Sequence, residues 1–308
     1  MNTNSLDTLN KQFAIHQEHV DIHLTQNEHG FPILNVRNPH AQARFSLYGA
    51  QMLSYKPHGS THDLFFLSEK AIYQTGKAIR GGAPLCWPWF GPDPEQKGRP
   101  AHGFARTNMW QLDKVEQLED QSSVVILTLE DTTETYAIWP YHFRLTLKVI
   151  IGKTLKMSLI TENRSDQPMQ ITQAIHSYFA VGDIAQVQVD GLEDLSYIDK
   201  SKLGQNQTKT QNGAIAIDQE VDRIYLNSPD QVQISDRSRQ QTVHILNQNS
   251  QTTVVWNPWI DICQQMNDLQ NNDYKKFICV ETANVATNTI CIEAGKQFQL
   301  DTEYNLIK

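Results

Sequence analysis

Hydrophobic and polar residues alternate in short runs along much of the chain. The clearest runs are SSVVILTL (122–129), FRLTLKVI (143–150) and TLKMSLIT (154–161). Successive side chains of a strand point to opposite faces of a sheet, so this period of two predicts β-strands. The second and third runs are joined by Ile151-Gly152-Lys153, which predicts a hairpin.

Further strand-like segments are separated by turn residues. They are 169–180, 185–190, 215–217, 231–234, 242–246, 253–256, 276–281, 289–292 and 297–304. Many short strands at regular spacing predict an all-β fold, namely a large antiparallel β-sandwich with a few short helices. The two helical candidates are 259–268, whose apolar residues have helical spacing, and a short turn of helix over 68–74.

No linker, charge block or internal repeat divides the 308 residues. All-β folds of this length often form one domain, so we expect a single domain over residues 11–308. Residues 1–10 are expected to be a loose N-terminal segment, because chain ends are poorly ordered unless something ties them down.

Charge and composition narrow the possible partners. The chain has 26 Lys and Arg against 34 Asp and Glu, a net charge of −8, and no basic block, which argues against nucleic acid or an anionic membrane as partner. We expect no secretory signal, because residues 1–20 lack a basic start followed by an apolar core, and no apolar run approaches the roughly 20 residues needed to span a bilayer. The four cysteines match no zinc or redox spacing. We therefore expect a cytoplasmic monomer with reduced thiols.

The segment IRGGAPLCWPWFGP (79–92) is the most distinctive part of the chain, and AHGFAR (101–106) follows it. The first segment contains too much Gly and Pro for a helix or a central strand. It is also too aromatic for an ordinary solvated loop. We interpret Trp87, Trp89 and Phe90 as one wall of a polar-ligand pocket. Arginines nearby suit hydroxyl, carboxylate or phosphate groups, and a sugar is the first candidate ligand.

Two residues could carry acid–base chemistry. In AIHSYF, His176 shares a predicted strand face with Tyr178 and could donate a proton into the pocket. Glu281 ends a buried strand, where desolvation would raise its pKa towards working pH. The ordinary structural alternatives are a hydrogen-bonded core histidine for His176, and a salt bridge or a solvated strand end for Glu281.

Four further residues could bind a ligand. Asp222 in EVDRIY could orient a sugar hydroxyl or hold an active-site histidine, and His102 before Gly103 could bond a hydroxyl. Arg80 and Arg106 could bind an anion. The structural alternatives are a solvated surface for Asp222, a turn histidine for His102, and surface ion pairs for the arginines.

Metal and nucleotide motifs are not evident. The histidines within 16–23 and 58–63 lack third and fourth ligands at zinc-like spacing. The sequence contains no phosphate-binding Walker loop, no GxGxxG after a strand and no GxSxG. We therefore expect neither a metal nor a cofactor.

Six motifs in order resemble those of the hexose-6-phosphate mutarotases, or glucose-6-phosphate 1-epimerases, a branch of the aldose 1-epimerase superfamily. The motifs are IRGGAPLCWPWFGP, AHGFAR, AIHSYF, EVDRIY, VVWNPW and DYKKFICVETAN, within residues 30–305. The resemblance implies the galactose mutarotase-like sandwich, in agreement with the strand pattern. It also implies an isomerase that interconverts the α and β anomers of a hexose 6-phosphate, with glucose 6-phosphate as the first candidate.

The resemblance also implies residue roles. It assigns His176 as general acid and Glu281 as general base. It assigns Asp222 to substrate hydroxyls and to setting the protonation of the site. It assigns sugar and phosphate contacts to His102, Arg106 and Arg80, with Lys77 a weaker phosphate candidate. Glu281 would take the proton of the anomeric hydroxyl while protonated His176 donates a proton to the ring oxygen. The ring then opens and can close on the other face of the carbonyl. This scheme requires a desolvated Glu281 and a His176 that is largely protonated near pH 7.

Three other functions remain open. The first is an epimerase of free aldoses, which would differ only in its anion contacts. The second is a non-catalytic carbohydrate-binding sandwich, which would not need both His176 and Glu281. The third is a glycosidase with Asp222 and Glu281 as its carboxylate pair.

Overall fold

The computed structural model describes residues 5–307 of the protein. Its largest sheet has nine antiparallel strands, in the spatial order β17 (Ile215–Ala216), β14 (Val187–Asp190), β19 (Gln231–Asp236), β20 (Gln241–Gln248), β24 (Gln297–Ile307), β10 (Leu155–Asn163), β9 (Phe143–Ile151), β8 (Ser123–Glu130) and β7 (Gln111–Gln117). The predicted hairpin is confirmed, since Ile151 of β9 lies opposite Leu155 of β10.

Two other sheets cover this one. The eight-stranded sheet has the order β16 (Gln207–Thr210), β15 (Ser196–Asp199), β18 (Val221–Leu226), β21 (Thr252–Asn257), β22 (Phe277–Asn284), β12 (Gln173–Ile175) and β6 (Leu85–Cys86), and β13 (Tyr178–Ala180) also pairs with β22. The five-stranded sheet runs in sequence order through β1 (Ile15–Gln17), β2 (Val20–Gln26), β3 (Pro32–Arg37), β4 (Ala41–Ser46) and β5 (Gln51–Pro57). A two-stranded sheet joins β11 (Met169–Ile171) to β23 (Ile290–Ile292).

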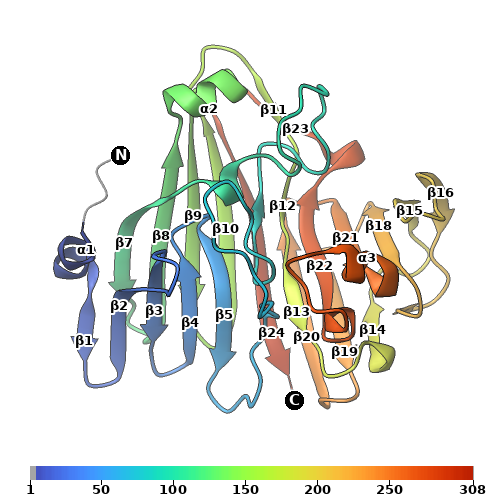
Figure 1. Ribbon diagram of the computed structural model, residues 1–308, viewed down its shortest axis with the longest axis horizontal. Helices are drawn as coiled ribbons and strands as arrows, with labels where there is room; N and C mark the ends of the chain where they lie inside the picture. The colour runs from blue at the N-terminus through green and yellow to red at the C-terminus, as the bar shows by residue number, and fades with distance from the viewer. Residues whose placement is uncertain (1–4, 308) are drawn as a thin grey trace.

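The main core fills the space between these sheets. In Figure 1 the blue strands β2–β5 lie in front of the green strands β7–β9, and both contribute to one buried cluster. Asn38, after β3, donates hydrogen bonds to Ser123 Oγ and the Ile151 carbonyl, which ties the two sheets together. Between the nine-stranded and eight-stranded sheets, the hydroxyls of Tyr304 and Ser177 share a 2.6 Å hydrogen bond. The predicted antiparallel β-sandwich is therefore confirmed.

Helices are short and peripheral. They are α1 (Leu6–Phe13), α2 (Thr133–Ile138) and α3 (Trp259–Gln265), with 3-10 turns η1 (Ala105–Thr107), η2 (Ile184–Gln186), η3 (Asp273–Lys275) and η4 (Ala286–Asn288). The predicted helix over 259–268 forms but ends earlier, at Gln265. Residues 68–74 form only a turn at 69–70, so the helix predicted there is wrong. None of the helices within residues 5–307 is long and apolar enough to cross a membrane.

The N-terminal segment contains more structure than the sequence predicted. Residues 6–10 belong to helix α1, whose first turn is capped by the Ser5 hydroxyl, which accepts from the Thr8 amide. The Asn10 side chain exchanges two hydrogen bonds with the backbone of Leu24, which fastens the helix to β2. Residues 1–4 lie outside the described part of the chain. The single-domain organisation stays a prediction, favoured by one buried cluster that extends from Val20 to Tyr304.

Candidate active site

The predicted site residues gather on the face of the eight-stranded sheet that points away from the main core. In β22, Ile278 and Val280 belong to the main core, so the alternating Glu281 side chain points to the opposite face. In the neighbouring strands, Val254 lies opposite Glu281, and Asp222 lies opposite Trp256.

His176 lies between two short strands that both pair with β22. The predicted continuous strand over 169–180 is instead divided into β11, β12 and β13. The predicted alternation nevertheless holds, because Ile175 and Phe179 enter the main core while His176 stacks on Tyr178 on the other face. The His176 amide donates to the Pro84 carbonyl, which ties this turn to the 79–92 loop.

The structure brings His176 and Glu281 together. Their Nε2 and Oε1 atoms are 3.3 Å apart, and the side chains are 9% and 1% exposed. Glu281 Oε2 and His176 Nδ1 are buried without a hydrogen-bond partner among residues 5–307. Two groups that can each hold or release a proton therefore touch in a desolvated setting.

The charge state of the pair differs from the expected one. Burial raises the pKa of Glu281 well above its usual range, and the nearby Asp222 charge adds to this effect. Burial also lowers the pKa of His176, assisted by His102, Arg106 and Arg80. Both shifts run against the protonated His176 that the reaction scheme requires. Both directions favour the neutral forms of the two groups, a protonated Glu281 carboxyl and an uncharged His176 imidazole.

The two arginines have different surroundings. Arg80 Nε lies 3.0 Å from Asp268 Oδ2, and its Nη1 donates to the Tyr178 hydroxyl at 2.8 Å. The structural alternative of an ion pair thus applies to Arg80. Arg106 donates from Nη2 to the Ala101 carbonyl, and within residues 5–307 it contacts no carboxylate while its buried Nε lacks a partner. Arg106 therefore has more unbalanced positive charge than Arg80. The weaker candidate, Lys77, is exposed.

His102, in the AHGFAR segment, lies beside the His176–Glu281 pair. Its φ of 65° and the φ of 70° at Gly103 fold the chain tightly over Trp87, and a Cβ on residue 103 would lie 2.0 Å from the Trp87 carbonyl oxygen. The His102 ring is 5.9 Å from that of His176. Burial lowers the pKa of His102 to about 3, so the ring is neutral. Its Nδ1 accepts from the Gly91 amide at 3.3 Å, which leaves Nε2 as the protonated nitrogen that can donate to a hydroxyl.

The aromatic-wall interpretation is wrong for two of its three residues. Trp87 is fully buried in the main core and donates from Nε1 to Thr161 Oγ1. Trp89 is 4% exposed and lies beneath the Arg99 guanidinium. Only Phe90 stays partly exposed, with its ring edge against His102. The large apolar side chains of this irregular loop cover the sandwich and do not line a pocket.

Asp222 is partly buried and does not hydrogen-bond His176, although it raises the pKa of Glu281. Burial raises the pKa of Asp222 itself from 3.8 to about 6. Its folded carboxyl therefore binds its proton more tightly than the unfolded one, so it costs stability as pH rises from about 4 to 6. We expect Asp222→Asn to raise the free energy of unfolding at pH 8 by roughly 1–3 kcal/mol, with no gain at pH 3.5.

Urea denaturation of the two proteins at both pH values checks this prediction. An equal gain at pH 3.5 and pH 8 would contradict it, because the gain would then not come from ionisation of the carboxyl.

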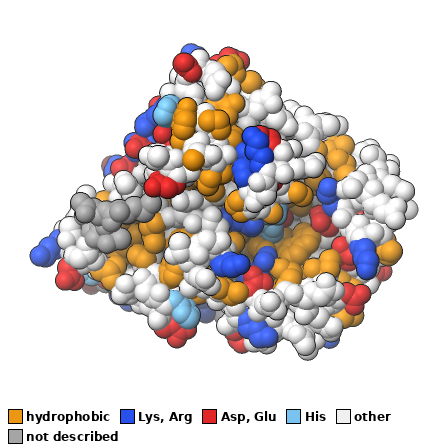
Figure 2. All heavy atoms as spheres, turned by 45° about the horizontal axis from the view of Figure 1, so that its top comes forward, with side chains coloured by type: hydrophobic (Ala, Val, Ile, Leu, Met, Phe, Trp, Pro, Cys, Tyr) orange, Lys and Arg blue, Asp and Glu red, His pale blue; other side chains and the backbone are white. Residues whose placement is uncertain are grey.

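Figure 2 shows where this face is hollowed. Right of centre, on the side where Figure 1 places β18, β21 and β22, hydrophobic side chains line a depression with basic and histidine side chains at its margin. Ile224 and Val254 share the row of Glu281 across the sheet and belong to a small buried apolar cluster. Apolar surface beside polar groups suits the C–H face of a sugar.

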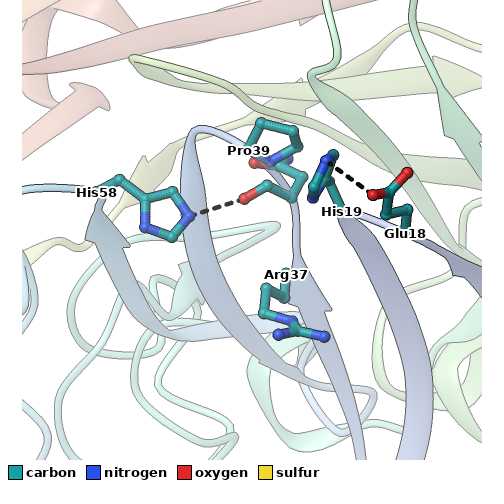
Figure 3. A pocket seen from close by; sticks show the side chains of 6 residues that line it. Glu18, His19, Arg37, Pro39 and His58 are labelled. Atoms are coloured by element: carbon teal, nitrogen blue, oxygen red, sulfur yellow. Dashed lines mark hydrogen bonds and ion pairs between the residues drawn. The ribbon is translucent and has the colours of Figure 1, made fainter.

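A second hollow lies elsewhere, on the five-stranded sheet (Figure 3). It has a volume of about 420 Å³ and is lined by Glu18, His19, Arg37, Asn38, Pro39 and His58. None of the predicted site residues lines it, and the His19 and Glu18 side chains are 70% and 89% exposed. Across residues 5–307, no three His, Cys, Asp or Glu side chains are grouped to hold a metal ion.

Three residues near the pair were not predicted as site residues. Trp256 presents its ring at 80° to both His176 and Tyr178, at 6.0 Å from each. Tyr178 could have been found from its shared face with His176. Trp256 and Asp268 carry no such local signal. The register of β21 brings Trp256 to the site, and the loop after α3 brings Asp268 there.

Comparison with known proteins places the chain in a family. The aldose 1-epimerase family model matches residues 32–305. An Escherichia coli K12 protein named "putative glucose-6-phosphate 1-epimerase" is 38% identical over 252 residues, which is 82% of each chain. A crystal structure of a "putative mutarotase" from Salmonella typhimurium has 32% identity and a TM-score of 0.86, and the match covers 97% of this chain and 99% of that one. A galactose mutarotase-like protein from Clostridium acetobutylicum shares the fold at 14% identity and a TM-score of 0.75, over 95% of this chain and 100% of that one. The chain belongs to the aldose 1-epimerase family.

Proposed function

We propose that the protein interconverts the α and β anomers of a hexose 6-phosphate, with glucose 6-phosphate as the preferred substrate. The observation that carries this proposal is the contact between His176 Nε2 and Glu281 Oε1, close enough to Arg106 and Arg80 for their charges to lower the pKa of His176. The proton pair supports ring opening and closure, and the arginines support an anionic substituent. The name of the Escherichia coli relative, "putative glucose-6-phosphate 1-epimerase", agrees with this proposal.

The proposed chemistry moves protons between the pair and the sugar. Transfer of the shared proton from Glu281 to His176 gives a carboxylate and an imidazolium without changing the total charge. The carboxylate of Glu281 takes the proton of the anomeric hydroxyl, and the imidazolium of His176 protonates the ring oxygen as the C1–O5 bond breaks. Rotation about C1–C2 exposes the other face of the aldehyde, and the reverse transfers close the ring.

Substrate phosphate would also adjust the acid. The charges of Arg80 and Arg106 contribute to the lowered pKa of His176 in the free site. A phosphate paired with these guanidinium groups offsets their charge and thereby raises the pKa of His176. Binding of a phosphorylated sugar thus favours the imidazolium that ring opening requires, whereas a free sugar provides no such effect.

We expect Arg106→Ala to raise KM for glucose 6-phosphate by about 10- to 100-fold, since a charge-assisted phosphate bond is lost. For Arg80→Ala, whose charge Asp268 already balances in part, the expected rise is smaller. KM for free glucose should change by less than threefold in Arg106→Ala. Arg44→Ala, an exposed arginine on the five-stranded sheet, is the matched control and should leave both KM values unchanged. Equal effects of Arg106→Ala on the two sugars would contradict a phosphate role.

The other candidate functions are separated by one assay. Anomer exchange is measured by saturation-transfer NMR with glucose 6-phosphate and with free glucose near neutral pH. A clear preference for the phosphorylated sugar supports the proposal, whereas equal or preferred exchange of free sugar indicates a free-aldose epimerase. Binding of sugar without exchange indicates a non-catalytic carbohydrate-binding protein, and cleavage of glycosides indicates a glycosidase. A cytoplasmic location and a monomeric state stay predictions.

A further inference from the structure

The His176 imidazole lacks the hydrogen bond that usually orients a catalytic histidine. In most such sites the second ring nitrogen bonds a carboxylate or carbonyl, which fixes the ring. Here Nε2 faces Glu281, and Nδ1 is buried with no hydrogen-bond partner on any other residue of 5–307. Rotation of the ring is therefore restrained at one nitrogen only, by a group that must itself be free to contact substrate.

Aromatic contacts replace the missing hydrogen bond. The Tyr178 ring stacks on the imidazole with centroids 4.8 Å apart and planes only 8° from parallel. The Trp256 ring packs in a T-shaped arrangement against both of these rings. A flat ring packed against the imidazole face opposes its tilting, because tilting would force the two rings to overlap.

Tyr178 is in turn held at its far end. Its hydroxyl accepts a 2.8 Å hydrogen bond from Arg80 Nη1, and Arg80 Nε is paired with Asp268 Oδ2 at 3.0 Å. Tyr178 is 1% exposed, while the two charged side chains are 23% and 15% exposed. Two hydrogen bonds, shielded in part from water, thus connect a loop carboxylate to the ring that faces the imidazole.

We propose that Tyr178 is a positioning residue that sets the orientation of the His176 imidazole. The Arg80–Asp268 ion pair holds Tyr178 in turn. This inference rests on the proposed function, since it assumes that His176 transfers a proton to the sugar. Under this inference Arg80 positions Tyr178 in addition to binding phosphate. Asp268 assists the reaction without contacting the substrate.

Two substitutions at Tyr178 separate stacking from hydrogen bonding. Tyr178→Phe keeps the stacked ring but loses the hydrogen bond from Arg80, so it should lower kcat for glucose 6-phosphate by about threefold to tenfold, as Asp268→Ala should. Tyr178→Leu removes the flat face and should lower kcat by about 10- to 100-fold, while KM changes by less than threefold. Phe66→Leu is the control, because Phe66 packs in the same apolar cluster and stacks on Phe277 without contacting His176. It should keep the wild-type kcat.

Several results would overturn the inference. A folded Tyr178→Leu with kcat within threefold of wild type would do so, as would an equal loss of kcat in Phe66→Leu. If Tyr178→Leu fails to fold, Asp268→Ala decides the matter. A threefold to tenfold fall in kcat at saturating substrate supports the inference, and an unchanged kcat overturns it. Failure of the proposed function is distinguishable, because the wild type would then catalyse no anomer exchange at all.

Discussion

Glu281→Gln is expected to lower kcat for anomer exchange of glucose 6-phosphate by about 10²–10⁴-fold, the usual contribution of a positioned acid or base. The amide has nearly the shape of the carboxyl but cannot take the proton of the anomeric hydroxyl. Substrate contacts elsewhere in the hollow remain, so KM should change much less than kcat. Polarimetry on a freshly dissolved pure anomer gives both constants.

The same substitution should stabilise the fold at neutral pH. Burial raises the pKa of Glu281, so the folded carboxyl holds its proton while the unfolded one loses it above about pH 4.5. The wild type therefore loses stability as pH rises through this range, and the glutamine variant does not. Loss of activity together with a higher urea midpoint at pH 8 excludes unfolding as the cause. Glu293→Gln, on an exposed turn, is the matched control and should change neither property. Near-normal exchange by Glu281→Gln would remove Glu281 from the reaction.

His176→Asn is expected to lower kcat by a similar factor, about 10²–10⁴-fold. Asparagine can still form a hydrogen bond but cannot transfer a proton to the ring oxygen. Because the two groups act together in one ring-opening step, the double variant with Glu281→Gln should be little slower than either single variant. His244→Asn, in β20 of the nine-stranded sheet, serves as the control with unchanged kcat.

The pH dependence of stability gives an independent test of His176. Its pKa is lowered in the folded state, so the unfolded chain binds more protons below about pH 6.5 and the wild type loses stability as pH falls through that value. His176→Asn lacks this contribution, and its unfolding free energy should fall less between pH 7 and pH 5. A decrease equal to that of the wild type would show that His176 titrates normally, contrary to its burial.

The sequence predicted the sandwich well because its strands carry a strong period of two. The run 143–150 became β9, with Leu145, Leu147 and Val149 all buried in the core. The signal was weaker where the chain is irregular. Helix α1 depends on contacts between Asn10 and β2, which lie fourteen residues apart and leave no local pattern.

The roles of the site residues stay predictions, but the structure shows which of these residues lie together and how they are surrounded. His176 and Glu281 were identified from their motifs, and their 3.3 Å contact agrees with the expected pairing. Trp87 and Trp89 were misassigned, because aromatic residues of a covering loop and of a ligand wall look alike in a sequence. The protonation of the pair could not be predicted either, since it depends on how deeply the sheet buries both groups.

The central claim is that the buried His176–Glu281 pair catalyses exchange between sugar-phosphate anomers. The most direct test is magnetisation transfer between the α and β anomeric signals of glucose 6-phosphate at equilibrium, near pH 7, with wild-type protein and with Glu281→Gln. We predict transfer well above the uncatalysed rate with the wild type and a rate close to the uncatalysed one with the variant. No acceleration by the wild type, or equal acceleration by both proteins, would contradict the claim.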